Sequence, residues 1–226
     1  MIDIIDNKRA KQSLSFSILE ITLVEFYRFI PIIFVLLVNL VWADEKEQFT
    51  HQHDNLSYNI KVGDWIFRKG VQVDSLIAHQ FSGGKFSHIG MVVSINPDIK
   101  IIHATTSDDE NYPNQVIISS FDEFITPELA EKYAIARPNF LSEIQNQQIV
   151  NELLTKQGQA FVLASREEPH LYCTTLLYDA IIKYQPEFTV QWQHTQFPFF
   201  SGEYLFPSAF ANHPDITWIY HYPTLN

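Results

Sequence analysis

Apolar and polar positions alternate in several short stretches of the chain, and this pattern indicates β-strands. Ser87–Ile95 and Lys100–Thr105 have the strongest strand pattern, because apolar and β-branched residues dominate both. The residues Asn96-Pro97-Asp98 between them are typical of a turn, so the two strands are predicted to pair. Three further strands are predicted at Asp64–Arg68, Gln115–Ser119 and Lys132–Arg137.

In other stretches apolar residues recur at helical spacing. The last clear helix is Tyr172–Tyr184, in which Cys173, Leu176 and Leu177 share one face. Gln185–Asn226 is rich in aromatic residues and proline, and we expect it to be irregular and to pack over the body. Further helices are predicted at Val71–Phe81, Ser120–Ile125 and Leu141–Gln157, the last with Ile144, Ile149, Val150, Leu153 and Leu154 as its candidate core positions.

Composition is that of a globular protein. The chain has 226 residues, of which 46% are hydrophobic, and its formal charge is −11. An acidic balance of this size argues against a nucleic-acid binder, which needs a basic surface to meet phosphates. The single cysteine excludes an internal disulfide framework and a cysteine-rich zinc site. Residues 60–226 are therefore predicted to form one α+β domain.

The N-terminal segment, residues 1–43, has the pattern of a Sec signal peptide or an uncleaved signal anchor. Basic residues up to Arg28 precede the apolar run Phe29–Trp42, which is shorter than the roughly 20 residues of a membrane-spanning helix. A buried helix of the folded domain is the third alternative. Residues 44–59 are polar and predict a flexible linker. Both export alternatives place the body outside the cytoplasm, most simply in a periplasm, and allow membrane association through the N-terminal segment.

Cys173 is the candidate nucleophile. It lies at the start of the predicted helix, where unpaired backbone N–H groups and the helix dipole stabilise a thiolate and are expected to lower the thiol pKa. The same N–H groups can hold a developing oxyanion. The competing interpretation is that Cys173 fills the core, because it shares a helix face with apolar residues.

Two histidines lie on the strongest pair of strands. Strand alternation sends His88 and Gly90 to one face, and Gly90 leaves space beside the imidazole. If Ile95–Asp98 forms a four-residue loop, His103 lies opposite Gly90 and diagonal to His88, within reach of a hydrogen bond between the two rings. A base oriented by a second polar group is the arrangement that a thiol nucleophile needs. A slip of one residue in the register would remove this contact.

Four short motifs together resemble a known family. They are Gly63-Asp64-Trp65-Ile66-Phe67, Ser87-His88-Ile89-Gly90, His103-Ala104-Thr105 and Tyr172-Cys173-Thr174-Thr175-Leu176. Over residues 60–185 this pattern is similar to the YiiX/YebB-like group of permuted NlpC-type papain-like amidases, whose topology is akin to that of lecithin-retinol acyltransferase. The histidine strand precedes the cysteine helix in this group, as it does here.

The resemblance implies a circularly permuted papain-like fold, in which an antiparallel sheet packs against the helix that carries the cysteine. It implies that Cys173 is the nucleophile, His88 the general base and His103 the residue that orients His88. Asp64 matches the group's glycine-aspartate strand start, where a structural role is expected. The group commonly has serine and glutamate after the cysteine, where this chain has Thr174 and Thr175, so an assisting role for that acid is in doubt.

The expected activity is that of a cysteine-dependent hydrolase that forms an acyl-thioester and needs no cofactor. The substrate is either a cell-wall peptide amide or an acyl-lipid, and aromatic residues near the C-terminus, including Phe200 and Tyr204, allow the latter. The alternatives are a lipid acyltransferase and a non-catalytic module that binds fatty acids or peptides. No metal site is expected, because the remaining candidates fall in no ligand motif; these are His79, His170, His194, His213 and His221.

Overall fold

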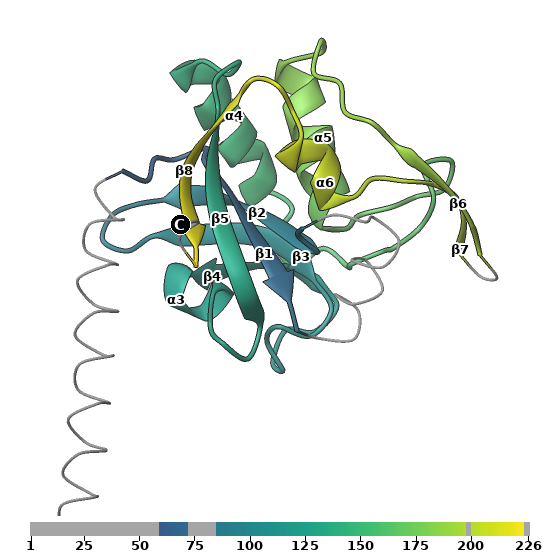
Figure 1. Cartoon of the computed structure of the whole chain (residues 1–226), viewed down its shortest axis with the longest axis horizontal. Coiled ribbons are helices and arrows are strands. Elements are labelled where there is room, and N and C mark those ends of the chain that lie inside the picture. The colour runs from purple at the N-terminus through teal and green to yellow at the C-terminus, as the bar shows by residue number, and fades with distance from the viewer. Residues whose placement is uncertain (1–58, 72–84, 198–199, 224–226) are drawn as a thin grey trace, which may run out of the picture. The chain divides into compact units, whose positions relative to one another are not determined.

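A computed structural model describes residues 59–71, 85–197 and 200–223, and in it a six-stranded antiparallel sheet forms the body (Figure 1). The strand order is β4-β3-β2-β1-β5-β8. The strands are β1 Trp65–Gly70, β2 His88–Ser94, β3 Lys100–Thr105, β4 Gln115–Ser120, β5 Ala130–Pro138 and β8 Ile216–Tyr222. This arrangement confirms the predicted α+β class, an antiparallel sheet and the five predicted strands.

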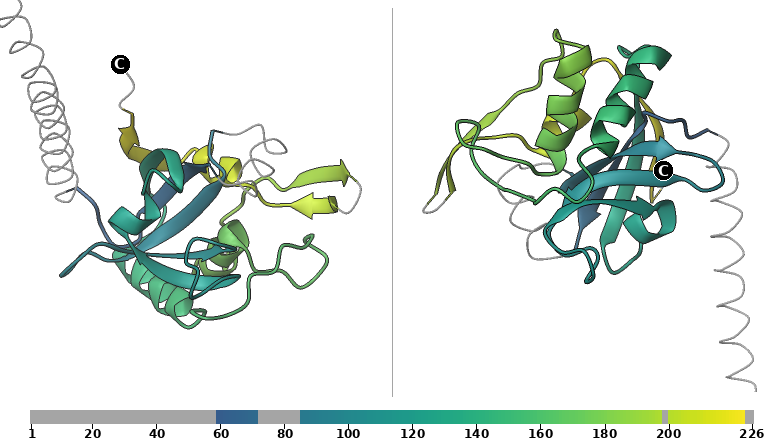
Figure 2. Two further views of the ribbon diagram at one scale, coloured as in Figure 1. Left: turned by 90° about the horizontal axis from the view of Figure 1, so that it is seen from below. Right: turned by 180° about the vertical axis from the view of Figure 1, so that it is seen from behind.

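Four helices are described besides the sheet. They are α3 Phe121–Phe124, α4 Glu143–Leu154, α5 Cys173–Tyr184 and α6 Pro207–Ala211. Helix α5 contacts both α4 and the strands β2 and β3, so the helix that carries Cys173 packs against the sheet as expected (Figure 2). None of the helices in the described part of the chain is long and apolar enough to cross a membrane.

The sheet has a core on each face. Trp65, Phe67, Ile89 and Met91 point toward the side of α4 and α5, where they pack against residues such as Leu177. Residues of opposite parity point to the other side and form a second cluster with α3. That cluster contains Ile66, Val92, Ile101, Phe121, Phe124 and Ile135. Both faces of the central strands are therefore buried, which explains their near-continuous apolar sequence.

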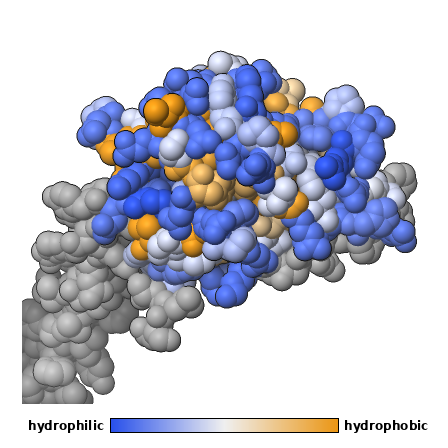
Figure 3. All heavy atoms as spheres, turned by 90° about the horizontal axis from the view of Figure 1, so that it is seen from above, coloured by the Kyte–Doolittle hydropathy of each residue, from blue (hydrophilic) through white to orange (hydrophobic). Residues whose placement is uncertain are grey.

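Two expectations about core and topology were wrong. Residues after Gln185 are not irregular, because they form β8, α6 and the hairpin of β6 Gln193–Phe197 with β7 Phe200–Tyr204. In α4, Ile144 is 74% exposed and Leu154 is also exposed, while Ile149, Val150 and Leu153 are buried. On the face drawn in Figure 3, apolar side chains lie in small groups between hydrophilic ones.

Several sequence-based expectations concern segments that are not described. The N-terminal segment, residues 1–43, lies outside the described residues, as do 44–58 of the expected linker. The expected helix Val71–Phe81 also lies outside them, apart from Val71. The carbonyl oxygen of Asn59 accepts a hydrogen bond of 2.6 Å from Arg137 Nη2, so the body begins at or before this residue.

Candidate active site

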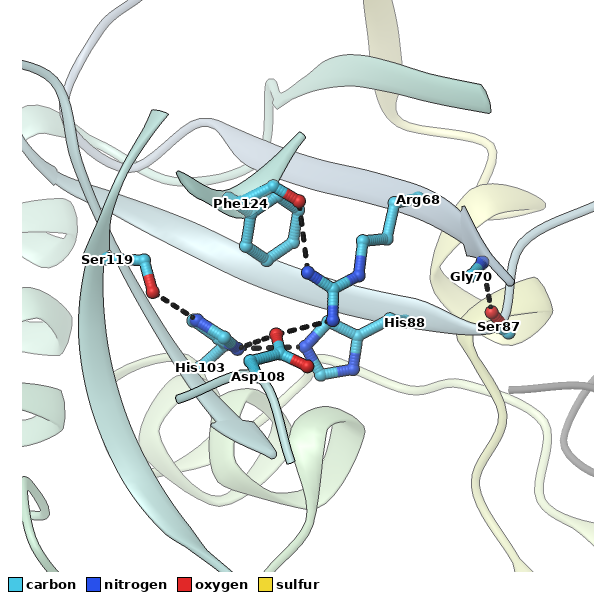
Figure 4. A network of polar contacts seen from close by, with 8 residues as sticks. All are labelled: Arg68, Gly70, Ser87, His88, His103, Asp108, Ser119 and Phe124. Atoms are coloured by element: carbon cyan, nitrogen blue, oxygen red, sulfur yellow. Dashed lines mark hydrogen bonds and ion pairs between the residues drawn. The ribbon is translucent and has the colours of Figure 1, made fainter. Parts of the chain in front are cut away.

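His88 and His103 are in direct contact. His88 begins β2, His103 lies in β3, and the distance between His88 Nε2 and His103 Nδ1 is 2.9 Å (Figure 4). The strands pair Met91 with Ile102, and continuing this register by one residue sets Gly90 opposite His103. A Cβ atom on Gly90 would lie 3.3 Å from His103 Cβ and 2.6 Å from a side-chain atom of Ile101, so only glycine leaves the room that this pair needs. The predicted register at His103 and the diagonal contact are confirmed, but the four-residue loop is not, because Ser94 pairs with Lys100 and the register shifts between Val92 and Ser94.

His103 is held at both ring nitrogens. Its Nε2 lies 3.0 Å from Ser119 Oγ, which belongs to the neighbouring strand β4. The ring of Phe124 packs edge-on against His103, with a centroid distance of 5.0 Å, and contacts His88 as well. A chain of polar contacts therefore runs across three strands from Ser119 through His103 to His88.

An ion pair that the sequence pattern does not reveal lies beside the two histidines. Arg68 Nη2 lies 2.5 Å from Asp108 Oδ2, and the two side chains are only 3% and 7% exposed. The same Asp108 oxygen is 3.7 Å from His103 Nδ1. Arg68 also donates from Nη1 to the carbonyl oxygen of Phe124 at 3.0 Å, and its guanidinium lies over the Phe124 ring. Asp108 follows β3 in a loop, and no motif in the sequence marks it.

Burial and Arg68 keep both imidazoles neutral. Burial lowers the pKa of His88 well below 6.5, and Arg68 and His103 lower it further, while Asp108 opposes them. Burial likewise lowers the pKa of His103 to about 3. For Asp108, burial is the largest influence and would raise the pKa, but the charge and hydrogen bond of Arg68 together with the two histidines outweigh it, so the carboxyl pKa lies below its ordinary value. The site therefore contains two neutral imidazoles beside one compensated pair of charges.

Cys173 is the first residue of α5 and is buried. The backbone N–H groups of Ile89 and Thr174 favour its thiolate form. The pairing of β2 with β3 begins only at Met91, so Ile89 lies beyond the last paired position and its N–H can serve the thiol. The expected depression of the thiol pKa is wrong for this structure. Burial raises the pKa of Cys173 to about 11, because it outweighs the two N–H groups and the Arg68 charge that act in the other direction.

One cavity joins the cysteine to the histidine. A hollow of about 330 Å³ is lined by both Cys173 and His88, together with Arg68 and Asp108. Cys173 belongs to the core on the α5 side of the sheet, whereas His88 contacts Phe124 of the opposite core. The two reach a common space at the end of the sheet, where β2 and β3 are no longer paired. His103 stands behind His88 and does not line this cavity.

Other residues of the sequence motifs have structural roles. Asp64 accepts bonds of 2.8 and 2.7 Å from Arg137 and one of 2.8 Å from the backbone N–H of Lys61, and it faces a different cavity. Thr174 Oγ1 donates to the carbonyl oxygen of Leu205 at 2.7 Å. The Thr175 hydroxyl accepts from the Tyr172 backbone N–H at 2.9 Å. Neither threonine supplies an acid to the site.

Within the described residues, one group of acidic, histidine or cysteine side chains has its ligand atoms close enough to hold a metal ion. It consists of His88, His103 and Asp108, with these atoms within 4.8 Å of one another. The histidines His170, His194, His213 and His221, which were considered and set aside as ligands from the sequence, do not form such a group, and His79 lies outside the described residues.

Comparison with known proteins gives a likeness in structure. No family model and no curated protein matches the sequence. The structure resembles a crystal structure described as that of the metalloprotein YiiX from Escherichia coli O157:H7, with a TM-score of 0.59 and 18% sequence identity. The alignment covers 72% of this chain and 97% of the YiiX chain. The protein therefore has a YiiX-like fold.

Proposed function

We propose that this protein is a cysteine-dependent acyl hydrolase of the permuted papain-like type, with Cys173 as nucleophile and His88 as general base. The observation that carries the proposal is the shared cavity of these two side chains, in which His88 is fixed by a 2.9 Å contact with His103. The YiiX-like fold supports it, and so does the chain order, with the histidine strand β2 before the cysteine helix α5.

The contacts of His88 define how it can act as a base. To accept a proton at Nδ1, His88 carries its hydrogen on Nε2 and donates it to His103 Nδ1. His103 then carries its own hydrogen on Nε2 and donates it to Ser119 Oγ. In this tautomer chain His103 is the orienting residue, and Asp108, 3.7 Å away, stabilises the positive charge that develops on the imidazoles.

The reaction begins when His88 takes the thiol proton as the Cys173 sulfur attacks the substrate carbonyl. A tetrahedral oxyanion forms, and the backbone N–H of Cys173 at the start of α5 stabilises it. His88 passes the proton to the departing amine or alcohol, and an acyl-thioester remains. Water activated by His88 then releases the acid and restores the thiol.

The test is acylation of the purified protein by an activated ester. Wild-type protein should gain the mass of the acyl group on Cys173 and turn over, while Cys173→Ala should do neither. His88→Ala should slow both steps by roughly 100- to 10,000-fold, the usual worth of a general base. Turnover that survives in Cys173→Ala would overturn the proposal. Product analysis with an added alcohol or amine distinguishes hydrolysis from acyl transfer, and binding without any adduct indicates a non-catalytic module.

A metal centre is the second candidate function, because the relative is described as a metalloprotein and His88, His103 and Asp108 are close together. The donors as they stand in this structure favour a hydrogen bond over a cation. Nε2 of His88 and Nδ1 of His103 lie 2.9 Å apart, which suits a shared hydrogen, and binding one ion would require both lone pairs to turn to it and this hydrogen bond to be lost. The Asp108 carboxylate is engaged by Arg68, whose charge would repel a metal ion. We therefore assign these residues to proton transfer.

Location outside the cytoplasm, with possible attachment through residues 1–43, belongs to the same proposal. It rests on the sequence pattern of the N-terminal segment alone. Expression of the full chain in a bacterial host, followed by fractionation and determination of the N-terminus, tests it. A mature N-terminus near Asp44 in the periplasmic fraction is the expected result for a cleaved signal peptide, whereas full-length protein in the cytoplasm would contradict export.

A further inference from the structure

The cavity at Cys173 has two chemically different ends. Arg68 and Asp108 lie at one end, together with the loop that follows β3. Much of the remaining wall is apolar, and its large apolar side chains come from two segments far apart in the sequence. These contribute Phe161 and Leu163 on one side, and Phe200, Tyr204, Leu205 and Phe206 on the other.

Charge at the polar end is already neutralised. Among the described residues that line the cavity, only Arg68 and Asp108 carry a full charge, and they are paired with each other at 2.5 Å. Neither is left over to bind the carboxylate or ammonium group of a charged peptide. A substrate that owed its binding to such groups would have to be desolvated here without a partner, which is unfavourable.

At the apolar end of the cavity, the wall consists of side chains that other contacts hold in place. Phe200 and Tyr204 of β7 stack on each other with a centroid distance of 3.9 Å. On the other side, Val162 forms an isolated β-bridge with Leu171, which holds the segment that carries Phe161 and Leu163 near the start of α5. The β6–β7 hairpin projects from the body (Figure 2), and its strand β7 contributes Phe200 and Tyr204 to the wall of the cavity. Leu163 is 51% exposed, which leaves an apolar side chain facing solvent at this rim.

We propose that the acyl part of the substrate is a hydrocarbon chain, which lies against Phe161, Leu163, Phe200 and Tyr204 while its carbonyl carbon meets Cys173. This inference rests on the proposed function and names its substrate class. In the reaction a carbon–sulfur bond to Cys173 forms, the ester or amide bond breaks, and the thiol proton leaves with the alcohol or amine. Water then cleaves the thioester to a fatty acid and the free thiol.

The experiment compares p-nitrophenyl acetate with p-nitrophenyl octanoate, using the purified protein. Burial of one methylene is worth about 0.8 kcal/mol, or roughly a fourfold change, so kcat/KM should be at least about tenfold higher for the octanoate. Leu163→Gln should reduce this preference by roughly threefold or more. The matched control is Ile144→Gln, because Ile144 is an exposed apolar residue that does not line the cavity, and it should leave the preference unchanged.

The outcomes separate this inference from the proposed function. Equal rates for the two esters, or a preference that Leu163→Gln does not alter, would overturn the hydrocarbon assignment while Cys173-dependent turnover stands. Faster cleavage of alanyl p-nitroanilide than of octanoyl p-nitroanilide would also overturn it, in favour of a peptide substrate. Octanoate hydrolysis that continues in Cys173→Ala would overturn the proposed function itself.

Discussion

Replacing Asp108 and replacing Arg68 should move the acid limb of the pH–rate profile in opposite directions. Asp108 favours a protonated His88, and Arg68 opposes it. A ring nitrogen of His88 and a carboxylate oxygen of Asp108 lie within 4.8 Å of each other. At an effective dielectric constant of about 20, two unit charges at this distance interact by about 3 kcal/mol. Asp108→Asn should therefore lower kcat/KM by roughly 100-fold if positive charge develops on His88 during attack.

The assay is kcat/KM for p-nitrophenyl octanoate between about pH 4 and 9. The pKa of His88 should fall further in Asp108→Asn and rise in Arg68→Met, so the acid limb should move to lower pH in the first variant and to higher pH in the second. Each single change also leaves one buried charge without its partner, which should cost about 3–5 kcal/mol of unfolding free energy. The double variant Arg68→Met/Asp108→Leu should recover most of that loss in urea denaturation.

The control uses a second, partly buried ion pair of the body. Asp64 and Arg137 are 2.7 Å apart and lie on a different cavity, so Asp64→Asn should destabilise the fold without moving the acid limb. Acid limbs that move in the same direction in Arg68→Met and Asp108→Asn would refute the electrostatic reasoning. A double variant as unstable as either single variant would show that the pair is not the source of the loss.

Four further predictions follow from the site. Iodoacetamide labelling of Cys173 should keep accelerating above pH 9.0 toward about 11, and a plateau near the ordinary thiol pKa would contradict the burial described here. His103→Leu should lower kcat/KM by roughly 10- to 100-fold, because it leaves His88 Nε2 without a partner, and His103→Gln should lower it less. His103 binds a proton near pH 6.5 in the unfolded chain and only near pH 3 in the folded protein, so the free energy of unfolding should fall as the pH falls through this window, by at most about 1.4 kcal/mol per pH unit. In urea denaturation, the free energy of unfolding of His103→Gln should depend less steeply on pH. Incubation with EDTA should leave ester hydrolysis unchanged, and loss of activity that zinc restores would instead favour the metal centre.

The sequence predicted the sheet well where apolar runs were strong. β3 has the predicted bounds, and β2 differs from its prediction by one residue at each end, because both strands are buried on both faces and punctuated by a clear turn. β8 was missed because Ile216–Tyr222 is mostly half-buried, and its polar and aromatic residues give no clean alternation. Ile144 was misassigned because helical spacing alone does not show which face of α4 meets its neighbours; Ile149, Val150 and Leu153 are buried there, whereas Ile144 is exposed.

The histidine contact was predictable, and its electrostatic surroundings were not. A two-residue periodicity and a short loop fix how His88 and His103 face each other, so sequence reasoning could derive their proximity. Asp108 lies in a loop and meets Arg68 of β1, 40 residues earlier in the chain, so their contact depends on the path of that loop. Ser119 was within a predicted strand, but only the order β4-β3-β2 places it beside His103.

The thiol shows why a local rule gave the wrong sign. The start of α5 and the Arg68 charge do favour a thiolate, as the helix position predicts. However, loss of hydration destabilises the buried thiolate more than these groups stabilise it. Burial disfavours a charged His88 as well. A resting thiolate–imidazolium pair would therefore place in one site two charges that burial disfavours.

When a substrate carbonyl is present, the negative charge moves on to the oxyanion at the N–H groups, and the proton on His88 moves on to the leaving group. Proton transfer and attack should therefore occur together, so that this site reacts slowly with iodoacetamide and rapidly with an acyl ester that fits the cavity. Rapid alkylation at neutral pH combined with slow acylation would contradict this order.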